Sequence, residues 1–169
     1  MTRAIVVMGV SGCGKSTLGR ALAQSFGWVF IEGDELHPRS NIDKMAAGIP
    51  LDDADRAPFL ANVAEAMAEA LGPGVVAACS ALKRAYRDAI RARVGEATFV
   101  MPVLDRATLA ARMADRDGHF MPTSLLDSQF AALERPGADE QAILVDGLAP
   151  LEDQVAHVRA ALSTRGTCG

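Results

Sequence analysis

Residues 4–22, AIVVMGVSGCGKSTLGRAL, decide the fold class of this chain. The stretch opens with an uninterrupted apolar run, passes through a glycine-rich turn at 9–14, and continues with Leu18, Ala21 and Leu22 at helical spacing, a pattern that Phe26 extends beyond it. This order predicts a buried strand, a tight turn and an amphipathic helix. A strand that leads through glycines into a helix is the first unit of a layered α/β fold.

The rest of the chain repeats this alternation. The expected strands are uniformly apolar, as in a sheet that is covered on both faces, and they cover residues 28–31, 74–81, 97–104 and 141–147. The expected helices, of which two begin at an aspartate cap (Asp52 or Asp53, and Asp105), cover residues 52–72, 84–95, 105–118, 122–137 and 150–166. The sequence therefore predicts an α/β fold of three layers, with a five-stranded parallel sheet between helices. It contains no linker or repeat, so we expect residues 1–169 to form a single domain.

Composition limits the classes of function. The chain has 169 residues, a formal net charge of −4 and a pI near 5.3, which argues against nucleic acid or an anionic membrane as a partner. No apolar run approaches the roughly 20 residues of a membrane span, and the first residues lack a secretory signal pattern, so we expect a cytoplasmic protein. The three cysteines have no metal-binding spacing and are expected to be reduced thiols.

Residues 9–16, GVSGCGKS, match the pattern G-x-x-x-x-G-K-[ST] between the first strand and the first helix. Glycines allow successive backbone N–H groups to point at phosphate oxygens, and the helix N-terminus adds partial positive charge. Lys15 is expected to reach the β- and γ-phosphates of ATP, and the Ser16 hydroxyl to bind Mg²⁺, the predicted cofactor. The chain lacks the guanine-reading N-K-x-D of GTPases. The predicted ATP-binding residues of this loop are Gly9, Val10, Ser11, Gly12, Cys13, Gly14, Lys15, Ser16 and Thr17.

Residues 31–45, IEGDELHPRSNIDKM, place many titratable groups just after the second strand. If this segment is extended, Glu32 and Asp34 both face the sheet edge that carries the phosphate loop. Asp34 is our candidate for accepting the proton of an acceptor hydroxyl, and Glu32 for holding Mg²⁺ through water. The alternative is an acidic loop in solvent, which would not explain why several basic residues follow so closely.

Arg112 and Arg116 lie four positions apart before the segment DGHFMPTS, so a helix places both on one face. A glycine-containing loop at about 116–124 is expected to act as a mobile lid that brings Arg116 to the γ-phosphate. The alternative is two arginines on an exposed helix.

Five segments resemble one family of enzymes. MGVSGCGKSTLGRALA, EGDELHPRSNIDKMAAGIPLDDADRAPFL, CSALKRAYRD, RDGHFMPTSLLDSQFAALERPGADE and VDGLAPLEDQV are similar to the gluconokinases, small P-loop kinases related to shikimate kinase. The resemblance runs in order from about residue 4 to residue 160. It implies a P-loop kinase fold with a mobile lid, ATP-dependent phosphorylation of D-gluconate at its 6-hydroxyl, and a homodimer.

The resemblance also implies roles for individual residues. Arg112 would lie over the adenine, and the roles of Gln129 and Glu134 stay open. Glu32 stands where the family usually has aspartate, which puts the geometry of its contact with Mg²⁺ in doubt. The implied catalytic residues are Lys15, Asp34 and Arg116. The implied acceptor-binding residues are Asp34, His37, Lys44, Arg56, Lys83, Arg87 and His119.

The residues themselves agree with a sugar acid as the acceptor, because cations suit its carboxylate and polar groups suit its hydroxyls. Aromatic residues make up only 5% of the chain, which disfavours a nucleoside acceptor. Three alternatives stay open: a sister kinase for another small acceptor such as shikimate, a nucleotide-binding regulatory module without turnover, and a nucleic-acid-binding ATPase, which the acidic balance disfavours.

Overall fold

The computed structural model describes residues 2–115 and 123–166. Five strands form one parallel sheet in the order β2-β3-β1-β4-β5, which confirms the predicted sheet. The strands are β1 (Ala4–Val7), β2 (Val29–Glu32), β3 (Val75–Ala78), β4 (Thr98–Val103) and β5 (Ile143–Asp146). The central strand β1 leads into the glycine-rich loop, so this loop lies at the middle of the sheet's carboxyl edge.

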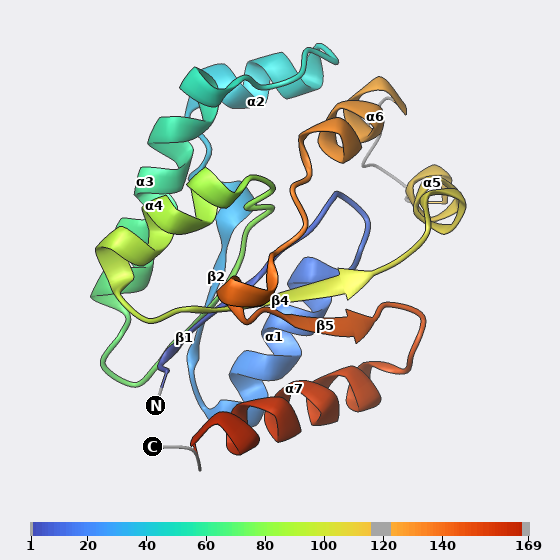
Figure 1. Ribbon diagram of the computed structural model, residues 1–169. Coiled ribbons are helices and arrows are strands. Elements are labelled where there is room, and N and C mark those ends of the chain that lie inside the picture. The colour runs from blue at the N-terminus through green and yellow to red at the C-terminus, as the bar shows by residue number, and fades with distance from the viewer. Residues whose placement is uncertain (1, 116–122, 167–169) are drawn as a thin grey trace.

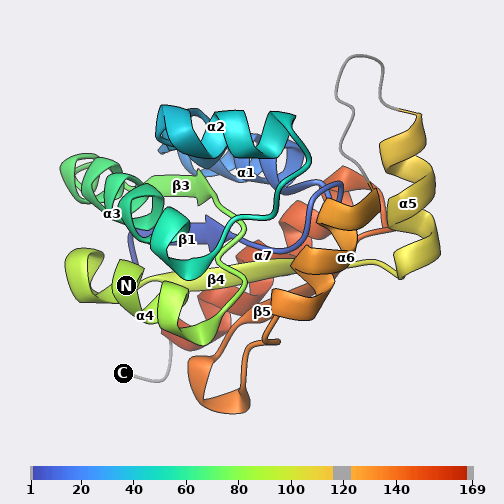
Figure 2. The ribbon, with the colours of Figure 1, turned by 90° about the horizontal axis from the view of Figure 1, so that it is seen from above.

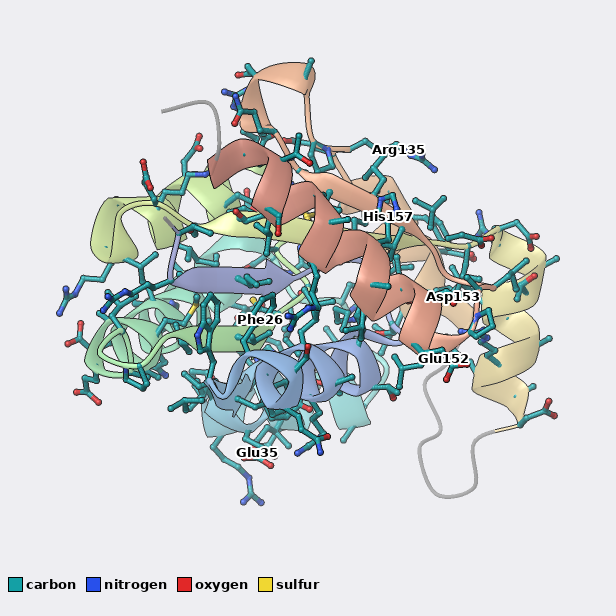
Figure 3. The ribbon with its side chains drawn as sticks, turned by 90° about the horizontal axis from the view of Figure 1, so that it is seen from below. Phe26, Glu35, Arg135, Glu152, Asp153 and His157 are labelled. Carbon is teal, nitrogen blue, oxygen red and sulfur yellow. The ribbon has the colours of Figure 1, made fainter. Side chains whose placement is uncertain are left out.

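Helices cover both faces of the sheet and complete three layers. Helices α3 and α4 pack together on one face (Figure 1), while α1 and α7 lie side by side on the other (Figure 3). Their bounds are α1 (Lys15–Phe26), α3 (Asp53–Glu69), α4 (Arg84–Val94) and α7 (Leu151–Gly166). Glu152, Asp153 and His157 of α7 point away from the sheet (Figure 3), and all three are exposed. Among the described residues, none of the helices combines the length and apolar character needed to cross a bilayer.

The alternation of side chains along β1 explains why the strands are apolar throughout. Ala4 and Val6 point into the core beneath α3 and α4, whereas Ile5 and Val7 point into the core beneath α1 and α7. Since successive strand residues face opposite sides, a sheet that is covered on both faces needs apolar residues at every position.

Two further helices lie beyond the carboxyl ends of β1 and β4 (Figure 2), α5 (Arg106–Ala114) and α6 (Thr123–Ala132). A third apolar cluster joins them to the glycine-rich loop through Val10, Leu109 and Leu126. The predicted Asp105 cap is confirmed, because its carboxylate accepts from the Thr108 backbone N–H at 2.7 Å. The Asp52 cap of α3 is confirmed in the same way, with the Asp55 N–H at 2.8 Å.

Two expectations about local structure are wrong. The extended course considered for residues 31–45 ends with β2 at Glu32: a 3₁₀ helix, η1 (Gly33–Leu36), and the helix α2 (Arg39–Ala46) follow. Helix α2 was missed because its periodicity is weak and its stability depends on partners in α3. The helix expected to stop at Pro136-Gly137 ends at Ala132 instead, since the Glu134 N–H turns away to donate to the Leu82 carbonyl at 2.8 Å.

Candidate active site

The phosphate loop, residues 9–16, joins β1 to α1 at the sheet's carboxyl edge. Gly14, immediately before α1, has a φ of 93°, in the left-handed region that L-side chains rarely adopt. The Lys15 ammonium donates to the Val10 carbonyl at 3.1 Å and so folds back over the loop. The first turn of α1 also carries Ser16 and Thr17, which places the predicted phosphate- and metal-binding groups together at a helix N-terminus.

Gln129 of α6 ties the phosphate loop to the segment that follows the expected lid. Its Oε1 accepts from the Ser11 backbone N–H at 2.7 Å, and its Nε2 donates to the Ser11 hydroxyl at 3.0 Å. The role of Gln129 was open from the sequence, because its partner Ser11 lies 118 residues away.

The segment that carries Asp34 packs against the end of β3. A Cβ on Gly33 would lie 2.2 Å from the Ala78 carbonyl oxygen, so only glycine allows η1 to approach this closely. The approach brings Asp34 to the buried Cys79, which directly follows β3. Burial raises the pKa of the Cys79 thiol to about 12, and the charges of Lys15 and Asp34 both act on it. The phosphate-loop lysine, which is half-buried, and the candidate base, which is exposed, therefore both lie near enough to Cys79 for their charges to act on its thiol.

His37 follows η1 and is half-buried. Its ring stacks on Phe59 of α3 at a centroid distance of 3.7 Å. Burial lowers the pKa of His37 from its ordinary 6.5, while the Asp34 charge raises it and the Arg56 charge lowers it. His37, Asp34 and Arg56 therefore lie in one neighbourhood.

The lysines on the acceptor side are paired with carboxylates from the first turn of α3. Lys44 of α2 donates to both carboxylate oxygens of Asp55, at 2.7 and 2.8 Å, and this bond raises the pKa of Lys44. Lys83 donates to Asp53 at 2.9 Å. Tyr86 also donates to Asp53, and Arg56 donates to the Tyr86 hydroxyl at 3.3 Å.

Arg87 is placed differently from the other predicted acceptor-binding residues. Its side chain is 0% exposed, and Glu140, at 2% exposed, accepts from its Nε and Nη2 at 2.6 and 2.8 Å. Its Nη1 donates to the carbonyls of Ala81 and Leu82, at 3.1 and 3.2 Å. This burial favours a supporting role, holding the turn that precedes Lys83, over contact with an acceptor.

Oxygen donors for a hard cation lie at the carboxyl ends of β1 and β2. They are the Ser16 hydroxyl and the Glu32 and Asp34 carboxylates, of which Glu32 also pairs loosely with Arg20 at 3.7 Å. In residues 2–115 and 123–166 there is no group of three or more His, Cys, Asp or Glu side chains that could hold a metal. This sparse oxygen set fits Mg²⁺, which keeps several waters and is completed by phosphate oxygens.

The expected lid lies mostly outside the described residues, and with it Arg116 and His119. Arg112 of α5 donates from Nη2 to the Gly147 carbonyl at 3.3 Å, next to the end of β5. Glu134, whose role was open, accepts from the Arg84 backbone N–H at 2.8 Å and thus caps α4.

Sequence reasoning missed several residues that support the site. The missed residues are Asn41, Asp53, Asp55, Tyr86 and Glu140. Of these, Asn41 carries a usable signal, because it lies four positions after His37, one helical turn away. The others are recognised only through partners that lie 11 to 53 residues distant.

Comparison with known proteins identifies the family of this chain. A family model described as an AAA domain matches residues 5–136. A gluconokinase from Gluconobacter oxydans is 48% identical over 164 residues, which cover 94% of this chain and 92% of that protein. The crystal structure of a gluconokinase from Sinorhizobium meliloti superposes with a TM-score of 0.86 at 48% identity, covering 95% of this chain and 91% of that one.

The fold alone is shared with a more distant enzyme. The shikimate kinase of Aquifex aeolicus superposes with a TM-score of 0.68 at 17% identity, covering 98% of this chain and 99% of that one. The identity to the gluconokinases is far higher and extends over nearly the whole chain. This chain therefore belongs to the AAA-domain family and, by these relatives, to the gluconokinases.

Proposed function

We propose that this protein transfers the γ-phosphoryl group of ATP to the 6-hydroxyl of D-gluconate, giving 6-phospho-D-gluconate and ADP. One observation carries the proposal beyond family membership. The charges of Lys15, on the phosphate loop, and of Asp34, on the segment with the acceptor residues, both act on the Cys79 thiol, and Gly33 lets that segment approach the end of β3 closely. A phosphoryl donor site and a base for a hydroxyl are the two parts that a small-molecule kinase has to bring together.

On the donor side, the backbone amides of residues 9–16 and the N-terminus of α1 bind the phosphates. Lys15 neutralises charge that develops on the transferring group. Mg²⁺, when bound, neutralises phosphate oxygens, and Ser16 and, through water, Glu32 would hold it. Arg112 would contact the nucleotide from α5.

On the acceptor side, Asp34 orients the attacking hydroxyl and accepts its proton as the phosphoryl group is transferred. Lys44, Arg56 and Lys83 attract and bind the gluconate carboxylate. His37 contacts a sugar hydroxyl. Arg87 acts through the turn that carries Lys83.

The lid residues Arg116 and His119 are proposed to close over the reaction, Arg116 at the transferring phosphoryl group and His119 at the acceptor. A homodimer and a cytoplasmic location stay predictions from the sequence and its resemblance.

The test is ADP release by the purified protein with Mg-ATP and a panel of acceptors. The panel contains D-gluconate, shikimate, other sugar acids and nucleoside monophosphates. We expect ADP release with D-gluconate. We also expect the ³¹P NMR spectrum of the product to show a phosphate monoester at the 6-position. Release with a different acid would overturn the acceptor assignment and keep the kinase chemistry, and ATP binding without any acceptor-dependent release would overturn the kinase proposal.

A further inference from the structure

Asn41 is a buried polar residue of α2 that no catalytic role explains. Its side chain is 1% exposed, among the few buried polar side chains of the described residues. The side-chain nitrogen Nδ2 donates to the Asp55 backbone carbonyl at 2.8 Å and lies 3.2 Å from Nδ1 of His37. One amide group therefore joins α2, the first turn of α3 and the imidazole of the acceptor segment.

These two contacts fix which ring nitrogen of His37 carries a proton. The Asp55 carbonyl can only accept a hydrogen bond, so the NH₂ end of the Asn41 amide, and not its oxygen, has to face it. The same NH₂ group also faces Nδ1 of His37. Because NH₂ only donates, Nδ1 has to be the unprotonated acceptor, and the neutral ring carries its proton on Nε2.

The ring has little freedom to escape this arrangement. Phe59, itself 2% exposed, stacks on it with an angle of 11° between the ring planes. The charged groups that act on the ring are Asp34 of η1 and Arg56 of α3. Protonating Nδ1 would point an N–H at the Asn41 NH₂ group, and burial opposes the charged ring as well.

We propose that Asn41 is a positioning residue of the acceptor site, which holds His37 as the neutral Nε2–H tautomer so that the imidazole donates one hydrogen bond to an acceptor hydroxyl. The proposal rests on the proposed function for the identity of the acceptor. It assigns different parts of the acceptor to different residues on this side of the site. The lysines and Arg56 recognise the carboxylate, and an uncharged His37 recognises an uncharged hydroxyl, for which a cation would bring no selectivity.

The first test reads the tautomer without any acceptor. ¹⁵N NMR of the histidine side chains distinguishes protonated from unprotonated ring nitrogens, and the chain has only three histidines, so a His37→Gln variant assigns the signals. We expect the ligand-free protein to show Nε2 protonated and Nδ1 unprotonated at pH 7.5. In Asn41→Asp the carboxylate favours a proton on Nδ1 and raises the pKa of His37. A proton on Nδ1 in the unaltered protein would overturn the proposal, whether or not D-gluconate is the substrate.

The second test measures kinetics in Asn41→Ala. We expect the KM for D-gluconate to rise about three- to tenfold, the scale of one lost hydrogen bond, while the KM for ATP stays within about twofold. In Asn41→Asp the rise should grow as the pH falls from 8 to 6, as His37 becomes charged.

The matched control is Asn62→Ala. Asn62 of α3 donates to the Leu36 carbonyl at 3.0 Å, so it anchors the same η1 segment through a hydrogen bond that does not involve the His37 ring. We expect the KM for D-gluconate of this variant to stay within about twofold of the unaltered protein. Equal rises in Asn41→Ala and Asn62→Ala, or an unchanged tautomer in Asn41→Asp, would reduce Asn41 to a general anchor and overturn the proposal.

Discussion

Replacing Glu140 with glutamine tests whether the buried Arg87–Glu140 pair holds the acceptor side together. The substitution keeps the shape of the side chain and removes its charge. It leaves the guanidinium of Arg87, which is fully buried, opposite a neutral amide. Of the two bonds from Arg87, the one that meets the new NH₂ group is lost.

The magnitude follows from two independent considerations. The Arg87 hydrogen bonds above all, with smaller contributions from the Gly137 N–H and Arg91, lower the pKa of Glu140 from 4.5 to about 2 against the opposing effect of burial. This difference corresponds to about 3 kcal/mol of stability carried by the ionised carboxylate. Removing one partner of a buried pair generally costs about 3–5 kcal/mol. We therefore expect Glu140→Gln to lower the free energy of unfolding at pH 7 by about 3 kcal/mol.

Urea unfolding followed by circular dichroism measures this change. With a slope of about 2 kcal/mol per molar urea, the midpoint should fall by about 1.5 M. Asp139→Asn is the matched control, since Asp139 is the neighbouring residue and pairs with Arg84 where both side chains are at least half exposed. Removing this exposed charge should shift the midpoint little.

The pH dependence of the stability difference between the two proteins tests this reasoning. Because the pKa of Glu140 is lowered on folding, its contribution is complete above about pH 4.5 and is lost as the pH falls toward about 2. The difference between the unaltered protein and Glu140→Gln should therefore be constant from pH 7 to 5 and close toward pH 2. Equal stability at pH 7, or a difference that persists at pH 2, would refute the reasoning.

Three further predictions concern the reacting groups and the phosphate loop. Asp34→Asn should lower kcat with D-gluconate by about a hundredfold or more and leave the KM for ATP within about twofold, because only proton transfer is lost; steady-state kinetics with near-normal turnover would remove Asp34 from its role. Gln129→Glu should raise the KM for ATP by roughly tenfold, since it places a like charge beside the phosphates, and Gln129→Met, which lacks the charge, should raise it less. Cys13 and Cys79 should resist a thiol reagent at pH 8 until the protein unfolds, because both are buried and Cys79 has a pKa of about 12; rapid labelling of Cys79 in the folded protein would contradict its placement.

Local patterns were enough to predict the sheet and the phosphate loop. An apolar run, a glycine-rich turn and a helical repeat in residues 4–22 are all short-range signals, and the structure has them as β1, the loop and α1. The Asp105 cap is equally local, since its partner is three residues away. Where the interaction that stabilises an element is encoded within one or two turns, the sequence is sufficient.

Helix α2 shows where this reasoning fails. Its ion pair between Arg39 and Asp43 is exposed and adds little by itself. Its contacts with α3, through Asn41 and Lys44, join residues 11 to 14 positions apart. A helix that depends on tertiary partners has no strong local pattern to predict it.

The sequence identifies the cations of the acceptor side but does not distinguish those that can contact an acceptor from those that are buried in ion pairs. Arg56 and Arg87 are both arginines on helices near the sheet's carboxyl edge, and the sequence offers no reason to treat them differently. What separates them is Glu140, which lies 53 residues after Arg87 and encloses it. Burial of a charge depends on its partner, so such a residue can be assigned only when the fold brings the partner into place.

The first turn of α3 explains how these cations can be held ready and still attract a substrate. Asp55 completes the capping box of α3 by accepting from the Asp52 N–H and also holds Lys44, while Asp53 holds Lys83. Each carboxylate fixes one lysine and offsets its charge, so among the described cations of the acceptor side Arg56 is the one without an ion pair. It contacts the Tyr86 hydroxyl, and its charge acts on Asp53 and His37. An arginine without an ion pair beside two preorganised ammonium groups suits an acceptor with a carboxylate, because these donors are ordered before the acceptor binds. The acidic start of α3, which in sequence looks like a helix cap and no more, thereby orders the two lysines that we propose to bind the carboxylate of the acceptor.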